Sequence, residues 1–250
     1  MAYTPAEFKR ELYKCEGAVY NLDKTLVDGR VAEGVGKQFL ISELFQGHLG
    51  HIWLGAKNYG EVNRLAKEQG HTAGLKHFIG VIASTGCATY DMFFRYARKY
   101  ISEKQLPGSS DFISYVGDSG GLYKQLITTL GADLSARAAR HCFDGWIKDS
   151  IGNPLTYDGI PGENPDELIT GINILMSNGE ERLELTEKML KKYGLSAGQC
   201  FVVGNDASDH ELMRAARMSA ASPLADNETK ELAHIWIPDY RTFLEELNGP

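Results

Sequence analysis

Apolar and polar residues alternate along the chain in two patterns, one typical of buried strands and one typical of amphipathic helices. Residues 4–14 predict a helix, with Thr4 as a possible N-cap and Pro5 at the first helical position. The short apolar run Ala18-Val19-Tyr20 then predicts a buried strand that ends at Asn21. The chain therefore opens with a helix followed by a strand.

The stretch from about residue 30 to 105 has helical spacing throughout and little strand alternation. Four helical segments are separated by glycine-bearing breaks: GKQFLISELF, GEVNRLAKEQG, GLKHFIGVIA and TYDMFFRYARKYISEK. We therefore expect a helical insert after the first strand.

The next part of the chain predicts a strand and then a helix. In FISYVGDSGG the apolar residues Phe112, Ile113, Tyr115 and Val116 indicate a strand that runs into a polar, glycine-rich loop. The segment GLYKQLITTLG predicts a helix that Gly131 ends.

The C-terminal half alternates between strands and helices. Short strands are expected in CFDGWI, INILM, QCFVV and HIWI, and helices in GEERLELTEKMLKKYG, in the segment after GNDASD, and after Asp239. The Gly- and Pro-rich segment at 152–167 predicts an exposed loop or hairpin. Outside the helical insert, this alternation predicts an α/β fold with a doubly wound, mostly parallel sheet.

Composition and charge narrow the function classes. The 250 residues are 43% apolar and 24% charged, as expected of an ordinary globular protein. A net charge of −7 argues against a general nucleic-acid binder but allows a local basic pocket for a small anion. The four cysteines are scattered and suggest neither a zinc site nor a disulfide framework. No signal-peptide core or membrane span is recognised, so we expect a cytosolic protein without a membrane partner.

Polar side chains gather at the expected carboxyl ends of the strands, where ligands of open α/β sheets bind. These residues are Asn21, Asp23, Gly117, Asp118, Ser119, Asn205, Asp206 and Asp209. Asp and Asn are also common helix caps and turn residues, so each residue alone has this simpler explanation.

The segment Asn21-Leu22-Asp23-Lys24-Thr25-Leu26 resembles the first motif of the haloacid dehalogenase-like (HAD) superfamily, which is an apolar strand followed by DxDxT. Most members are phosphatases or phosphoryl-transfer enzymes. The resemblance implies that position 21 is the nucleophile, that Asp23 is the general acid/base, and that the Asp23 carbonyl helps to hold Mg²⁺. Asn21 departs from the first of these roles.

Three further landmarks extend the resemblance to the C-terminus. The segment FVVGNDASD resembles the last motif, GDxxxD, with Asn205 at the first metal-binding carboxylate, Asp209 four residues later and Asp206 between them. Arg182 aligns with the lysine of the third motif, although a guanidinium is not equivalent to an ammonium group. For the Ser or Thr of the second motif, which binds the phosphoryl group, we rank Ser119 above Ser114.

The resemblance implies a Rossmann-like HAD core at residues 1–28 and 106–250, with a helical cap at 29–105 similar to that of the phosphoserine-phosphatase branch. The implied catalytic positions are Asn21, Asp23 and Arg182, the phosphate-binding residues are Ser119 and Arg182, and the metal positions are Asn21, Asp23, Asn205, Asp206 and Asp209. A carboxamide is a poor nucleophile, and two amides in place of carboxylates weaken a Mg²⁺ site.

The leading hypothesis is thus a phosphatase scaffold that binds a phosphorylated or other anionic small molecule, with hydrolysis impaired or lost. Three alternatives stay open. The chain could be a nucleophile-substituted variant of an active Mg²⁺-dependent phosphomonoester phosphatase. Asp23 could itself be the nucleophile, since DKT is similar to the phosphorylated loop of P-type ion pumps. The crevice could also be vestigial in a protein-interaction module.

Overall fold

The computed structural model describes residues 3–45, 47, 49–143, 145–160 and 166–249. For residues 44, 45, 49 and 51–56 it describes the backbone alone. No helix in these ranges is long and apolar enough to cross a membrane. The cytosolic location stays a prediction.

A six-stranded sheet forms the centre of the molecule, and all of its paired strands are parallel. In spatial order its strands are β3 (Ile147–Asn153), β2 (Gln125–Ala132), β1 (Gly17–Asn21), β6 (Cys200–Gly204), β7 (Met218–Ala221) and β8 (Ile235–Trp236). The chain runs outward from β1 to β3 and then returns to the other side of β1. The expected doubly wound α/β fold is therefore confirmed.

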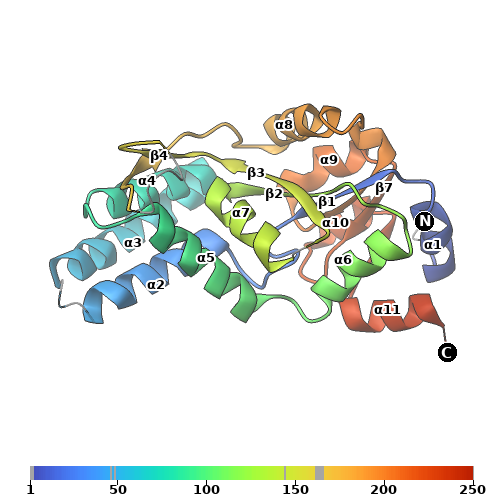
Figure 1. Cartoon of the computed structure of the whole chain (residues 1–250), viewed down its shortest axis with the longest axis horizontal. Helices are drawn as coiled ribbons and strands as arrows, with labels where there is room; N and C mark the ends of the chain where they lie inside the picture. The colour runs from blue at the N-terminus through green and yellow to red at the C-terminus, as the bar shows by residue number, and fades with distance from the viewer. Residues whose placement is uncertain (1–2, 46, 48, 144, 161–165, 250) are drawn as a thin grey trace.

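Alternate residues of the central strands face two separate helical layers. Tyr20 and Phe201 lie in the core cluster that also contains residues of α1 (Pro5–Leu12), α6 (Ser109–Asp118), α7 (Asp133–Cys142) and α11 (Tyr240–Asn248). Val19 and Val202 lie in a second cluster with residues of α8 (Gly179–Lys191) and α9 (His210–Ala215). Figure 1 shows α8 and α9 on one side of the sheet and α6 and α11 on the other. A strand buried on both faces explains why β1 reads as a continuous apolar run.

The helical insert contains the four expected helices. They are α2 (Val31–Phe45), α3 (Leu49–Gln69), α4 (His71–Ala83) and α5 (Tyr90–Lys104), and Figure 1 shows them gathered at one end of the molecule. The division into two domains, 1–28 with 106–250 and 29–105, stays a prediction.

Two neighbouring elements are the reverse of those predicted. The expected strand at 112–116 is helix α6, because Phe112, Ile113 and Val116 follow a helical period that buries one face. The expected helix at 121–131 is wrong, because strand β2 occupies most of that segment. Its run of apolar and β-branched residues, including Ile127 and Thr128, is buried on both faces between β1 and β3.

The strands expected in CFDGWI and INILM are wrong for most of their length, because β3 begins at Ile147 and β5 ends at Ile172, and helix α7 was not predicted. Several helix starts match the predictions. Helix α1 begins after the Thr4 cap, α8 begins after Asn178, and α11 begins after Asp239. The predicted hairpin is present, because β4 (Leu155–Tyr157) and β5 (Ile169–Ile172) pair antiparallel, although residues 161–165 between them lie outside the described residues. Strand β7 and helix α10 (Asn227–Leu232) were not predicted, because each is very short.

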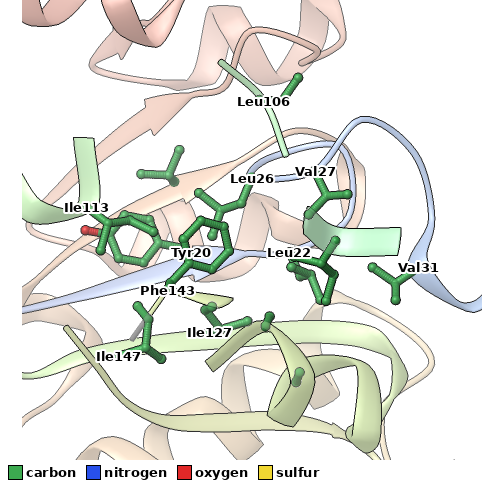
Figure 2. Packing of buried hydrophobic residues seen from close by; sticks show 14 of the residues in the cluster. Tyr20, Leu22, Leu26, Val27, Val31, Leu106, Ile113, Ile127, Phe143 and Ile147 are labelled. Carbon is green, nitrogen blue, oxygen red and sulfur yellow. The ribbon is translucent and has the colours of Figure 1, made fainter. Parts of the chain in front are cut away.

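Tyr20 links the sheet to the helices beneath it. Figure 2 shows its ring among apolar side chains from β1, the following loop, α6, β2 and β3, including Leu22, Ile113 and Ile147. Its hydroxyl donates a buried hydrogen bond of 2.6 Å to Gln125 Oε1. The amide of Gln125 in turn donates to the carbonyl of Ile113 at 3.2 Å. These two hydrogen bonds join strand β1 to strand β2 and to helix α6.

Replacement of Tyr20 by Phe should lower the free energy of unfolding by about 1–3 kcal/mol, because Gln125 Oε1 loses its donor in the dry core. Urea unfolding followed by circular dichroism measures this change. The matched control is Tyr13→Phe, since the Tyr13 side chain is exposed and its loss of a hydroxyl should leave the stability unchanged. Equal stability of Tyr20→Phe and the unmodified protein would contradict the described core.

Candidate functional site

The candidate site lies where the strand order reverses, between the carboxyl ends of β1 and β6. Asn21 is the last residue of β1, and Asn205 directly follows β6. Thr128 of β2 stands opposite Asn21 in the parallel register. Such a reversal leaves a crevice at the strand ends, which is where open α/β sheets bind ligands.

The amide nitrogen of Asn21 faces three oxygen atoms. It lies 2.5 Å from Asn205 Oδ1, 3.1 Å from Asp209 Oδ2 and 3.3 Å from the carbonyl oxygen of Asp23. On its other side, Asn21 Oδ1 accepts a 2.9 Å hydrogen bond from Arg182. A flipped amide would place oxygen against three oxygens and nitrogen against a guanidinium, so this network determines the amide orientation.

Arg182 of α8 is buried beneath the crevice, with its side chain 1% exposed. Its Nε and Nη2 donate to Thr128 Oγ1, and Nη2 also donates to Asn21. Its Nη1 donates to Ser208 at 3.3 Å and forms an ion pair of 2.5 Å with Asp209. These contacts can engage all five N–H groups of the guanidinium. Arg182 therefore holds the site together, and it must release a partner before it can bind a ligand directly.

Asp209 is the buried acceptor of this network. Its Oδ1 pairs with Arg182, and its Oδ2 accepts from the Asn21 amide and from the backbone N–H of Asn205 at 2.7 Å. Burial raises the pKa of the Asp209 carboxyl, and the adjoining Arg182 opposes that shift. Both carboxylate oxygens already have protein donors.

Asp206 lies at the edge of the crevice and caps the turn that follows β6. Its Oδ1 accepts from the backbone N–H of Ser208 at 3.0 Å and from the Ser208 hydroxyl at 2.7 Å. Burial acts to raise the pKa of Asp206, but these hydrogen bonds, together with Arg182 and Arg30, outweigh it and lower the pKa. Asp206 is thus a stable anion beside the cavity.

Asp23 is held between the helical insert and β2. Its Oδ1 accepts from the backbone N–H of Val31 at 2.8 Å, at the start of α2, and its Oδ2 accepts from Thr129 at 2.5 Å. The next residue, Lys24, has a φ of 57°, a left-handed conformation that turns the chain sharply after Asp23. The loop after β1 is therefore fixed at both ends.

The prediction for Ser119 is wrong. Ser119 caps the C-terminus of α6 and donates its backbone N–H to Tyr115, before β2 begins. It therefore lies toward the amino ends of the strands, whereas Asn21 ends β1 at the carboxyl edge. On the neighbouring strand β2, the buried Thr128 hydroxyl accepts from Arg182 beneath the crevice, and the adjacent Thr129 donates to Asp23. In the sequence, the two β-branched residues Thr128 and Thr129 after Leu126-Ile127 could have indicated that a strand ends near this position.

A cavity of about 210 Å³ opens above these residues. It is lined by Asn21, Asp23, Lys24, Arg30, His71, Leu130, Ser177, Arg182, Asp206 and Ser208. Three of these side chains are formally cationic and two are anionic, so the lining carries a small positive excess in a chain of net charge −7. Arg30 directly precedes α2, and His71 is the first residue of α4. No sequence motif predicted that either residue would lie at the site.

As the side chains lie, the site does not fit Mg²⁺. The Asn21 amide directs N–H groups, rather than an oxygen, at the three oxygens that would surround an ion. Asp209 is neutralised by Arg182, and among the described residues no group of three His, Cys, Asp or Glu side chains could hold a metal. Mg²⁺ prefers charged oxygen ligands in octahedral geometry, and this arrangement offers few.

Comparison of the sequence with protein-family models gives no match, and a search of curated proteins also gives none. Similar folds are found among solved structures.

The substrate-bound complex of a phosphoserine phosphatase superimposes with a TM-score of 0.64 and 18% identity, over 92% of this chain and 97% of that chain. A HAD family hydrolase from Salmonella enterica serovar Typhi gives a TM-score of 0.65 and 13% identity, over 90% of this chain and 68% of that chain. A Bordetella pertussis protein of unknown function gives 0.67 and 13%, over 88% of this chain and 97% of that one. The chain therefore has the HAD fold, in the form found in phosphoserine phosphatases.

Proposed function

We propose that this protein binds a phosphorylated or other anionic small molecule in the crevice at Asn21 and that it does not hydrolyse this ligand efficiently. The observation that carries the proposal is the Asn21 amide, fixed by Arg182 on one side and by three oxygens on the other. A phosphatase of this fold would need a carboxylate there, whereas a carboxamide is a poor nucleophile through either atom.

The charge around the cavity supports an anionic ligand. Lys24 and Arg30 line the cavity, and the buried Arg182 guanidinium adds positive charge from below. Ser177 and Ser208 also line the cavity, but their hydroxyl groups already donate to Glu181 and Asp206. The chain as a whole is acidic, which supports a small anion rather than nucleic acid as the ligand.

The surroundings of Asp23 argue against a shift of the nucleophile to that residue. One carboxylate oxygen accepts from the N–H of Val31, and the other accepts from the Thr129 hydroxyl. Attack on phosphorus requires a carboxylate oxygen that can approach the ligand, and these two hydrogen bonds restrict how the Asp23 carboxylate can move toward one.

Binding of the anion should not require Mg²⁺. The Asn21 amide and the Arg182 guanidinium already supply hydrogen atoms and positive charge to the oxygens of Asn205 and Asp209. The helical insert acts in this proposal as a cap, because Arg30 and His71 bring it to the same cavity as Asn21.

Inorganic phosphate should bind to the unmodified protein without Mg²⁺. Arg30→Gln should weaken this binding about tenfold, because the loss of a charge-assisted contact costs about 1.4 kcal/mol of binding free energy. Isothermal titration calorimetry measures the affinities. The control is Arg10→Gln, which removes the same charge from an exposed position on α1 and should leave the affinity unchanged.

The same preparations should release no phosphate from a panel of small phosphate esters, with or without Mg²⁺. Mg²⁺-dependent turnover by the unmodified chain would overturn the proposal and favour the active-phosphatase alternative. Absence of phosphate binding would instead favour the vestigial crevice of an interaction module.

Asn21→Asp should lower the free energy of unfolding at pH 7 by about 1–3 kcal/mol in the absence of Mg²⁺, because a carboxylate oxygen then faces three other oxygens without a hydrogen to share. Added Mg²⁺ should raise the thermal midpoint of this variant, since an ion can bind those oxygens. The midpoint of the unmodified protein should not change with Mg²⁺.

The matched control for this experiment is Asn178→Asp, at the N-cap of α8, where the side chain accepts from the N–H of Glu181 at 2.9 Å. Aspartate caps a helix as well as asparagine does, so this variant should show neither the loss nor the Mg²⁺ response. A rise of the unmodified protein's midpoint with Mg²⁺, equal to that of Asn21→Asp, would contradict the conclusion that the site does not fit Mg²⁺.

A further inference from the structure

A second cavity lies inside the helical insert, next to the crevice. It measures about 90 Å³ and is bounded by α2, α3, α4 and the residue before α2. Arg30 and His71 line both this cavity and the crevice at Asn21. The two spaces are therefore neighbours that share a wall made of two side chains.

The wall of the second cavity is mostly apolar. Its apolar residues are Ala32, Leu40, Tyr59, Val62, Ala66, Leu75 and Phe78. A third cavity of about 40 Å³ shares Leu40, Val62 and Phe78 with it. Together the two approach the roughly 150 Å³ of a dry apolar cavity that accommodates benzene. Movement of the shared side chains would join the two cavities into one space of a size that suits one aryl ring or a short alkyl chain.

Two glycines permit the close packing of the helices that form this cavity. A Cβ atom at Gly36 of α2 would lie 2.0 Å from the Phe78 ring of α4. A Cβ atom at Gly74 of α4 would lie 2.8 Å from the carbonyl oxygen of Val62 in α3. Side chains at either position would push the helices apart, so the walls of this space depend on the two glycines.

The two side chains of the shared wall, Arg30 and His71, differ in how they are held and in their charge. Arg30 pairs with the exposed Glu33 at 3.3 Å, so its guanidinium is held by a surface contact that is easily exchanged. Burial and the adjoining Arg30 lower the pKa of His71, although Asp23, Glu33 and Asp206 oppose the shift. The His71 ring is therefore neutral at pH 7 and can border an apolar group without the cost of a buried charge.

We infer that the ligand is amphipathic, with an anionic group in the crevice at Asn21 and an aryl or short alkyl group in the apolar cavity between α2, α3 and α4. The inference rests on the proposed function, because the crevice supplies the anion site. Arg30 and His71 lie at the junction and are placed to contact the bond between the two parts of the ligand.

The same cavity should disfavour a ligand whose organic part is charged. Arg30, Glu33 and Lys37 also line this cavity, but Arg30 and Glu33 already pair with each other. The ammonium and carboxylate groups of phosphoserine would therefore lose hydration against Leu75 and Phe78 without full compensation. For an aryl ring, binding instead becomes more favourable in proportion to the apolar area that is removed from water. The cavity thus selects by the polarity of the group attached to the phosphate.

Calorimetric titration with inorganic phosphate, phosphoserine and phenyl phosphate tests the inference. Phenyl phosphate should bind at least tenfold more tightly than either of the others. Failure of all three to bind would contradict the proposed function itself. Binding of inorganic phosphate with no gain for phenyl phosphate would contradict the amphipathic ligand alone.

Val62→Trp should remove the preference for phenyl phosphate, because the indole fills the cavity that Val62 lines, while inorganic phosphate should still bind with unchanged affinity. Retained phosphate binding also shows that the variant folds. The control is Lys67→Trp, an exposed position on the same helix that lines neither apolar cavity. A preference that survives Val62→Trp would overturn the inference.

Discussion

The buried ion pair between Arg182 and Asp209 is the interaction on which the rest of the site depends. Two charges of opposite sign lie out of water, and each is stable there only because the other and several neutral groups satisfy it. The guanidinium also donates hydrogen bonds to Thr128 from β2, Asn21 from β1 and Ser208 after β6. The ends of three strands are thus joined through one guanidinium, and removal of either charge would leave the other unpaired in the core.

This network also explains why an amide suits position 21. A carboxylate there would accept from Arg182 but would bring a second negative charge close to Asp209, with one guanidinium to balance both. The asparagine side chain instead accepts on one side and donates on the other, which matches a guanidinium and a cluster of oxygens without an added cation. Its chemistry is that of a structural connection between the ends of the strands.

Much of the fold and part of the site follow from sequence, for identifiable reasons. Asn21, Asp23, Asn205 and Asp209 end or follow apolar strands, and spacing to Gly204 correctly brought Arg182 to the crevice. Ser119 was wrong because periodicity alone does not separate a short buried helix from a strand buried on both faces, so α6 and β2 were exchanged. Arg30 and His71 could not be predicted, since their place depends on how the insert packs.

The contribution of the insert distinguishes this crevice from an isolated strand-end loop. Asp23 binds the first N–H of α2, so the position of the insert is coupled directly to the loop that begins at Asn21. Arg30 precedes that helix and His71 begins α4, and both side chains border the polar and the apolar cavity at once. A ligand that fills both spaces would contact the core and the insert together. The free energy of ligand binding would therefore favour the arrangement in which the core and the insert lie close together. In this way the insert would contribute to the choice of ligand at a site that the sheet forms.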